Sequence, residues 1–272
     1  MNHIMISFPE ASAEQREKLM ALLSTLELTG FEEADDKLIA YAEENNYDEA
    51  AITAIAEQLN TTFSIEAVSE RNWNEEWEKN FEPVVIDGFC SIRADFHAKP
   101  SNVTYDIVIT PKMSFGTGHH ATTASMISLM RGIDFAGKEI FDFGTGTGIL
   151  AILAEQLGAT KILAIDNDEW SYVNAVENCE RNKAQHIEVQ QNVIENIGQQ
   201  QFDIILANIN RHILLAYMKQ MSSCTKQNGI LLLSGILSED VAMIRAAAEE
   251  NSFVFAQQKT EGNWVCMQFT KK

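Results

Sequence analysis

Cysteine is scarce in this chain of 272 residues, which has only four widely spaced ones: Cys90, Cys179, Cys224 and Cys266. The sequence contains no Cys-x-x-Cys pair, which argues against a zinc site and against a disulfide framework. We therefore interpret the cysteines as reduced, mostly buried thiols of a cytoplasmic protein.

Long apolar runs are also missing, since no run approaches the 18 residues that a membrane-spanning helix needs. The first ten residues, MNHIMISFPE, lack the basic region and the apolar core of a signal peptide. The sequence therefore predicts no association with a membrane.

Positive charge is the third deficit, because 20 Lys and Arg face 39 Asp and Glu, for a net charge of −19. Residues 1–82 hold 19 of these acids and only 5 of the bases. Such an acidic segment repels phosphate backbones, so we expect no direct binding of nucleic acid. It suits a basic protein partner, although an acidic surface that only keeps the protein soluble is equally compatible.

The pattern of residues 1–68 predicts a small α+β domain. Strand patterns at residues 4–8, 38–42 and 62–68 accompany helical stripes at 19–26 and 52–59, and Ser12 with Gln15 resembles a capping box. We expect a β-α-β-β-α-β order, with an open sheet that carries both helices on one face. This part holds no catalytic constellation, so we interpret it as a recognition module.

Residues 69–82 are expected to form a linker helix. Trp73, Trp77 and Phe81 recur every four residues in an otherwise charged segment. Three large aromatic side chains on one stripe need a surface to pack on. We favour a connecting helix over a ligand-binding cage.

Residues 83–272 are expected to form an α/β domain. Strands near 105–110, 138–143, 161–166, 186–190, 203–207 and 229–234 alternate with helical patterns, which predicts a doubly wound, mostly parallel sheet. The last two strands, FVFAQQ and WVCMQFT, leave no room for a crossover helix between them. They should form an antiparallel hairpin at the edge of the sheet.

The segment KEIFDFGTGTGIL, residues 138–150, is the most informative stretch. An apolar strand ends in Asp142 and turns through Gly144, Gly146 and Gly148 into a helix, and the next strand ends in Asp166. Glycines let the backbone approach a ligand closely, beside the N–H groups at the start of a helix. A carboxylate about 20 residues further on accepts hydrogen bonds from ribose hydroxyls, so this turn predicts a cofactor that contains a nucleoside.

Two cofactors fit this turn. Gly146, Gly148 and Ala151 match the dinucleotide pattern, which keeps a nicotinamide-dependent oxidoreductase open. Asp142 favours the other candidate, because a carboxylate facing the cofactor repels a pyrophosphate but attracts the α-ammonium group of S-adenosylmethionine. We therefore favour a methyltransferase over a dehydrogenase, and over a glycine turn that binds nothing.

A second candidate segment spans residues 111–130. A Gly-Thr-Gly loop containing Thr117 leads to Thr122 and Thr123 at the start of a helix, where hydroxyl and free N–H groups can hold the cofactor. His119 and His120 are adjacent rather than at helical ligand spacing, so we predict no metal site and expect these histidines to face solvent or to pack.

A third segment, FDIILANINRHILL, places Asn208 at the end of a strand and Asn210 at the start of a helix. A neutral amide suits methyl transfer to nitrogen, because it accepts a hydrogen bond from the amine and leaves the lone pair exposed. Equally, both asparagines could simply cap the helix.

Together these segments resemble the methyltransferases of large-subunit ribosomal protein L-eleven (L11). The resemblance covers nearly the whole chain and rests on these segments: NWNEEWEKNFEP, FGTGHHATT, DFGTGTGILA, AIDND, NIN, SGIL and NWVCMQF. It implies a seven-stranded methyltransferase sheet, a ferredoxin-like N-terminal domain that binds the substrate, and transfer of methyl groups from S-adenosylmethionine to lysine ε-amino and N-terminal α-amino groups of that protein.

The resemblance also implies roles for individual residues. Thr123, Gly144, Asp166 and Asn208 would be cofactor contacts, and Asn208 would in addition face the incoming amine, with no general base assigned. The loop departs from the family, because this chain has His119 and Ala121 where the family has Thr and Pro. A methyltransferase for another protein or a small molecule, and a scaffold that binds without turnover, are the remaining alternatives.

Overall fold

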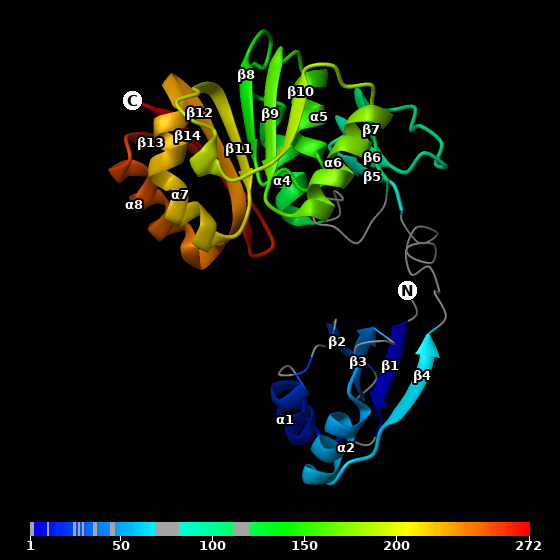
Figure 1. Cartoon of the computed structure of the whole chain (residues 1–272). Coiled ribbons are helices and arrows are strands. Elements are labelled where there is room, and N and C mark those ends of the chain that lie inside the picture. Colours follow the sequence, from blue (N-terminus) through cyan, green and yellow to red (C-terminus); the bar gives the residue numbers. More distant parts are fainter. Residues whose placement is uncertain are drawn as a thin grey trace. The chain divides into compact units, whose positions relative to one another are not determined.

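The computed structural model describes residues 3–9, 11–23, 26, 28, 30–34, 37–43, 47–68, 82–110 and 120–272 (Figure 1). The chain forms two compact units, residues 1–76 and 77–272. The predicted linker helix at 69–82 lies, except for Glu82, outside the described residues. Each unit is described by itself.

The N-terminal unit has the predicted β-α-β-β-α-β order. Its elements are β1 (His3–Phe8), α1 (Ala13–Leu23), β2 (Gly30–Ala34), β3 (Lys37–Glu43), α2 (Glu49–Gln58) and β4 (Ser64–Val68). The strands pair entirely antiparallel in the order β2-β3-β1-β4. The sequence pattern had located every element except β2.

One face of this small sheet carries both helices, as predicted. Ile4, Ile6 and Phe8 lie opposite alternate residues of β3 on the same face, and all three are buried. Leu19 of α1 and Ile52 of α2 belong to the same core cluster. The capping box also exists, because the Ser12 N–H donates to the Gln15 side chain at 2.8 Å and the Gln15 N–H donates to Ser12 Oγ at 3.3 Å.

The C-terminal unit is a doubly wound α/β domain. Its elements are β5 (Val84–Ile86), β6 (Cys90–Arg93), β7 (Tyr105–Val108), α4 (Ala121–Met130), β8 (Glu139–Phe143), α5 (Ile149–Gln156), β9 (Lys161–Asp166), α6 (Glu169–Arg181), β10 (Ile187–Gln191), η1 (Ile194–Asn196), β11 (Phe202–Asn208), α7 (Arg211–Cys224), β12 (Thr225–Leu237), η2 (Ser238–Asp240), α8 (Val241–Glu250), β13 (Phe253–Glu261) and β14 (Trp264–Lys271).

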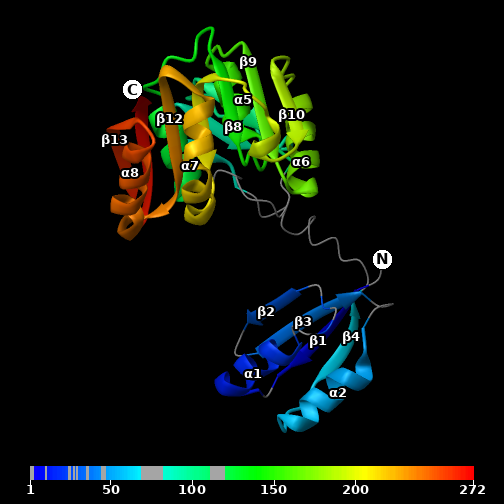
Figure 2. The same ribbon diagram turned by 60° about the vertical axis from the view of Figure 1, so that its left-hand side comes forward.

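Seven of these strands form one sheet in the order β10-β9-β8-β11-β12-β14-β13. The first five run parallel, and β13 and β14 form the predicted antiparallel hairpin, with β13 at the edge. Successive residues of each buried strand belong to different hydrophobic cores. In β8, for example, Ile140 packs with α4 and α5, whereas Phe141 packs with α7 and α8. Helices therefore cover both faces of the sheet (Figure 2).

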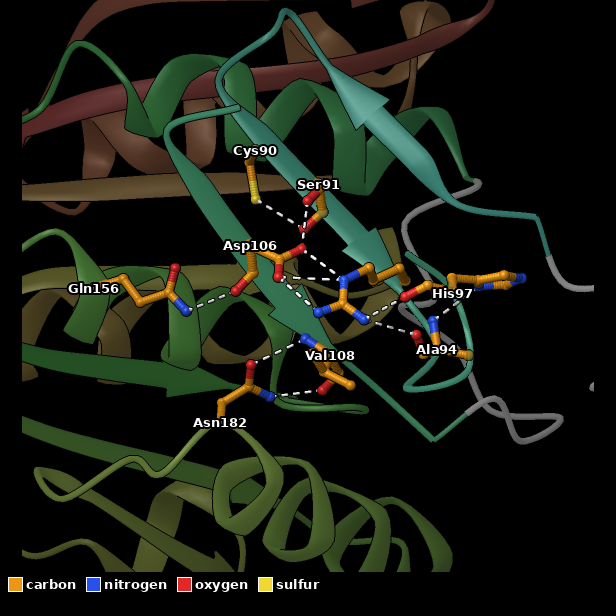
Figure 3. A network of polar contacts seen from close by, with 9 residues as sticks. Cys90, Ser91, Ala94, His97, Asp106, Val108, Gln156 and Asn182 are labelled. Carbon is orange, nitrogen blue, oxygen red and sulfur yellow. Dashed lines mark hydrogen bonds and ion pairs between the residues drawn. The ribbon is translucent and has the colours of Figure 1, made fainter. Parts of the chain in front are cut away.

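The strand predicted at 105–110 does not join this sheet. As β7, it forms a separate three-stranded sheet with β5 and β6, parallel to β6. Its other side meets α6, where the Asn182 side chain accepts from the Val108 N–H at 2.9 Å and donates to the Val108 carbonyl at 2.6 Å (Figure 3). Side-chain amides thus satisfy an edge that another strand would otherwise cover.

An ion pair holds β6 to β7. The Arg93 guanidinium donates from two nitrogens to the Asp106 carboxylate, at 3.0 and 2.9 Å, and both side chains are largely buried (Figure 3). Burial alone would raise the pKa of Asp106, but the hydrogen bonds from Arg93 and Ser91 keep that pKa below its ordinary value. Charge-assisted bonds therefore join β6 and β7 within the small sheet.

The carboxyl ends of β8, β9 and β11 meet at one edge of the large sheet. The chain leaves β8 toward β9 on one side, while β11 lies on the other side, so the strand order reverses between β8 and β11. Such a reversal is where open α/β sheets bind their ligands. No helix among the described residues is long and apolar enough to span a bilayer.

Candidate active site

A cavity of about 630 Å³ opens at this edge. This volume lies in the range of small-molecule sites. Six of the predicted cofactor residues line it: Thr122, Thr123, Gly144, Gly146, Asp166 and Asn208. Thr117 lies outside the described residues, so its predicted role remains a proposal.

The glycine turn has the backbone conformation that the sequence predicted. Gly144, Gly146 and Gly148 have φ angles of +73°, +55° and +80°, in the left-handed region that favours glycine. The N–H groups of Gly144 and Thr145 both donate to the Ile165 carbonyl of β9 at 2.9 Å. The turn is thus tied to the neighbouring strand before it opens α5.

Asp166 organises the same region. One carboxylate oxygen accepts from the Gly146 N–H at 2.9 Å, and the other accepts from the Asp168 N–H at 3.1 Å, at the N-cap of α6. An ionised carboxylate offers about four acceptor sites. Asp166 therefore shapes the turn and keeps acceptor capacity for the two hydroxyls of a ribose.

The position of Asp142 corrects one expectation, because this residue does not line the cavity. Its side chain is buried under the turn, where it accepts a hydrogen bond from Thr145 Oγ1 at 2.6 Å. Burial, together with the nearby charge of Asp166, raises the pKa of Asp142 to about 7. The carboxyl group thus supports the turn from behind rather than facing a ligand.

Asn208 and Thr123 bring two distant segments together. The Asn208 side-chain N–H donates to Thr123 Oγ1 at 3.2 Å, from the end of β11 to the first turn of α4. Asn210, by contrast, is the N-cap of α7 and accepts from the Ile213 N–H. The two asparagines thus have different roles, and only Asn210 caps the helix.

His120 has a role that the sequence analysis missed. It is the N-cap of α4, and its Nδ1 lies 3.3 Å from the Thr122 N–H nitrogen and 2.8 Å from Thr122 Oγ1. Its ring packs edge-on against Trp264, with ring centroids 4.8 Å apart, and both residues line the cavity. Trp264 comes from the C-terminal hairpin, and only the long-range pairing of β14 with β12 brings it here.

Ile209 is clamped between two glycines, which the sequence analysis also did not foresee. A Cβ on Gly144 would lie 2.3 Å from Ile209 Cγ2, and a Cβ on Gly235 would lie 2.2 Å from the Ile209 carbonyl oxygen. Atoms never approach so closely without a shift, so only glycine fits at both positions. The clamp fixes the backbone that carries Asn208.

The remaining wall is formed by the segment after β10 and by α7. Asn192, Val193 and Glu195 line the cavity, and the Tyr217 hydroxyl donates to Glu195 at 2.7 Å. No motif in the sequence marked these residues, because their contact depends on the packing of η1 against α7.

The charge of the cavity distinguishes between the two cofactors. Among the described lining residues, Asp166 and Glu195 carry negative charge and no Lys or Arg occurs. The carboxylates suit the sulfonium and ammonium groups of S-adenosylmethionine, whereas the pyrophosphate of a dinucleotide would have only the helix N-terminus and the glycine backbone to balance its charge. The residues present thus fit S-adenosylmethionine.

Comparisons with known proteins agree. The family model described as ribosomal protein L11 methyltransferase (PrmA) matches residues 5–272. A ribosomal protein L11 methyltransferase of Bacteroides thetaiotaomicron is 41% identical over 259 residues, which cover 93% of this chain and 92% of that protein. One from Chlorobaculum tepidum is 36% identical over 278 residues, covering 97% and 95% of the two chains. The crystal structure of a ribosomal protein L11 methylase from Lactobacillus delbrueckii subsp. bulgaricus aligns with a TM-score of 0.65 and 29% identity, over 71% of this chain and 100% of that one.

Proposed function

The chain belongs to the ribosomal protein L11 methyltransferase family, and we propose that it methylates lysine ε-amino groups and the N-terminal α-amino group of ribosomal protein L11. The observation that carries the proposal is the set of Gly144, Asp166 and Asn208, which line one cavity from the ends of three neighbouring strands. When bound, S-adenosylmethionine supplies a methyl group activated by a sulfonium.

The cofactor's nucleoside end is assigned to the side of the cavity near β9. Asp166 accepts hydrogen bonds from the ribose hydroxyls, and the backbone of Gly144 and Gly146 allows close approach. Thr122 and Thr123, in the first turn of α4, offer hydroxyl and N–H groups to the carboxylate end. Thr117 is proposed to contribute to the same end on the family resemblance alone.

Asn208 is proposed to position the amine. One of its two side-chain N–H groups donates to Thr123, which holds the amide in place, and its amide oxygen is the acceptor for a hydrogen bond from the substrate N–H. That bond orients the nitrogen lone pair toward the methyl carbon, and the Ile209 clamp prevents Asn208 from drifting. Positioning of this kind can supply several kcal/mol of the rate enhancement.

The site must also favour a neutral amine. With a pKa of about 10.4, keeping a lysine uncharged at pH 7 costs about 4.6 kcal/mol, whereas an α-amine costs about 1 to 1.4 kcal/mol. Desolvation in the cavity and the adjacent sulfonium charge both lower the amine pKa. The proton can then leave to water, and no residue is assigned as general base.

The N-terminal unit is proposed to recognise the protein substrate. Residues 1–82 carry a net charge of −14, which complements a basic ribosomal protein. The four free and buried cysteines, together with a ribosomal substrate, support action in the cytoplasm.

Incubation with methyl-labelled cofactor and undermethylated ribosomes, followed by mass spectrometry, tests the proposal. We expect the label on lysines and on the N-terminus of protein L11. Label on another protein, or absorbance changes at 340 nm with a nicotinamide cofactor and no label anywhere, would contradict it.

A further inference from the structure

Three asparagines recur at four-residue intervals along helix α6: Asn174 and Asn178 lie within it, and Asn182 is its C-cap. This spacing places them on one face of the helix. Asn174 and Asn178 are fully buried. Buried amides are costly unless they are hydrogen-bonded, so each contact that they make constrains the elements packed on α6.

Two of these asparagines hold β7 and the residues after it. Asn182 binds both the N–H and the carbonyl of Val108, as described above (Figure 3), and the Asn178 side chain accepts from the Thr110 N–H at 2.8 Å. The two side chains therefore bind alternate residues of one extended segment, much as a neighbouring strand would.

Asn178 makes two contacts that Asn182 lacks, one of which is a hydrogen bond donated to the Asn174 side-chain oxygen at 3.2 Å. Its side-chain N–H donates to the Thr147 carbonyl at 2.8 Å, and Thr147 lines the cavity between Gly146 and Gly148. The N–H of the same peptide unit, on Gly148, donates to the Thr145 carbonyl at 2.9 Å. Because a peptide unit is planar, the two bonds fix the orientation of this part of the turn.

Helix α6 also touches the turn directly. A Cβ on Gly148 would lie 3.4 Å from Cα and Cβ of Ala175, so the helix packs against the glycine backbone one turn before Asn178. The start of α6 is in turn bonded to Asp166 through the Asp168 N–H. Helix α6 thus supports both the glycine turn and the Asp166 carboxylate, which is proposed to bind the ribose.

We propose that Asn178 is a positioning residue for the cofactor: it holds the Thr147–Gly148 peptide in the orientation that cofactor binding requires. This inference rests on the proposed function, because it assigns the ligand of the turn. Asn178 acts through the backbone of the turn, whereas the Asn182 side chain bonds, among the described residues, to β7 and to the α6 backbone.

Replacement by aspartate separates the two roles. Asn178→Asp keeps an oxygen to accept from the Thr110 N–H but replaces the donor to the Thr147 carbonyl with an acceptor. Asn182→Asp is the matched control, because it keeps the acceptor for the Val108 N–H and loses the donor to the Val108 carbonyl. Asn182→Asp thus weakens the contact between β7 and α6 and leaves the turn intact, whereas Asn178→Asp keeps the bond from Thr110 and disturbs the turn.

Calorimetry with S-adenosylhomocysteine on the full-length protein measures the difference, with thermal unfolding as the check on folding. We expect Asn178→Asp to raise the dissociation constant about tenfold and Asn182→Asp to change it less than about twofold, although both lower the melting temperature. The inference is overturned if a folded Asn178→Asp protein binds as tightly as the wild type, or if both variants lose affinity equally.

A second pair keeps the test decisive if an aspartate variant does not fold. Asn178→Ser and Asn182→Ser remove the amides without adding charge, and the same difference in affinity is expected. If the wild-type protein itself fails to bind S-adenosylhomocysteine, the proposed function fails, which this design distinguishes from failure of the role of Asn178.

Discussion

The two units of this chain differ in sheet type, in charge and in what their strand ends carry. The N-terminal unit has an all-antiparallel sheet and lies in a segment with a net charge of −14, whereas residues 83–272 carry only −5. Every described residue that lines the cavity lies between 120 and 264. Parallel strands bring their loops to one edge and can build a site there, while a small antiparallel sheet mainly offers a surface. The comparison suggests that chemistry and recognition are divided between the units.

Removal of the N-terminal unit should have the largest effect on activity. A shortened chain that starts at Ser69 keeps the cavity, so we expect it to fold but to lose methylation of protein L11 by about 100-fold or more, because the encounter and the docking surface are gone. Initial rates on L11 with labelled cofactor measure this. Equal rates for both chains would show that residues 1–68 are not the recognition module.

Gly235→Ala tests the clamp within the C-terminal unit. The added Cβ must displace the Ile209 backbone and with it Asn208, so we expect kcat to fall about 100-fold. Gly137→Ala is the matched control, because Gly137 has a similar φ of +69° but no atom of the described residues lies within 4 Å of the added Cβ. If both variants retain the wild-type kcat, Asn208 does not need the clamp.

Asp142 makes the stability of the C-terminal unit depend on pH. Its pKa is raised from the ordinary 3.8 to about 7, so the folded state favours the protonated form. The stabilising preference is complete below pH 3.8 and is lost as the pH rises toward and through 7, which lowers the free energy of unfolding by about 2 to 3 kcal/mol between pH 5 and pH 8. Urea unfolding of Asp142→Asn should lack this decrease. The exposed Asp134→Asn serves as the control and should retain it.

Asp166→Ala tests whether Asp166 binds the ribose of the cofactor. Loss of charge-assisted bonds to two hydroxyls, each worth about 1.5 to 3 kcal/mol, should raise the dissociation constant of S-adenosylhomocysteine at least about tenfold. Calorimetry on a variant shown to be folded is the measurement. Unchanged affinity would move the ribose elsewhere in the cavity.

Salt should have the smallest of these effects, and it should change the reaction with protein L11 more than cofactor binding. If the acidic segment steers a basic substrate, kcat/KM for protein L11 should fall a few-fold as the ionic strength rises from low to physiological values. Affinity of the folded protein for S-adenosylhomocysteine should change less over the same range. A salt-independent kcat/KM would leave the charge of residues 1–82 with no part in the encounter.

Local sequence signals predicted one half of the cavity and not the other. Gly144, Gly146 and Asp166 belong to one strand-turn-helix-strand unit. Their spacing follows from the close approach of the backbone to the cofactor and from ribose binding, so a short stretch of sequence was enough to predict them. His120, Trp264 and Gly235 meet only through the pairing of β14 with β12 and the packing of α4, which no local pattern encodes.

Two errors have physical causes of the same kind. Asp142 was expected to face the cofactor, but the hydroxyl of Thr145 holds the carboxyl group under the turn. The strand containing Val108 was assigned to the large sheet, but the amides of Asn178 and Asn182 satisfy its edge and keep it apart. A side chain that takes the place of a backbone hydrogen-bond partner leaves no signal in the pattern of hydrophobic residues, so the sequence pattern did not predict either arrangement.

Calorimetric titration of S-adenosylhomocysteine into the chain that starts at Ser69 tests the division of labour most directly. We expect one binding site per chain, with the same dissociation constant as for the full-length protein, because every described residue of the cavity is retained. A folded shortened chain that does not bind, while the full-length protein does, would contradict it and place part of the cofactor site in the N-terminal unit.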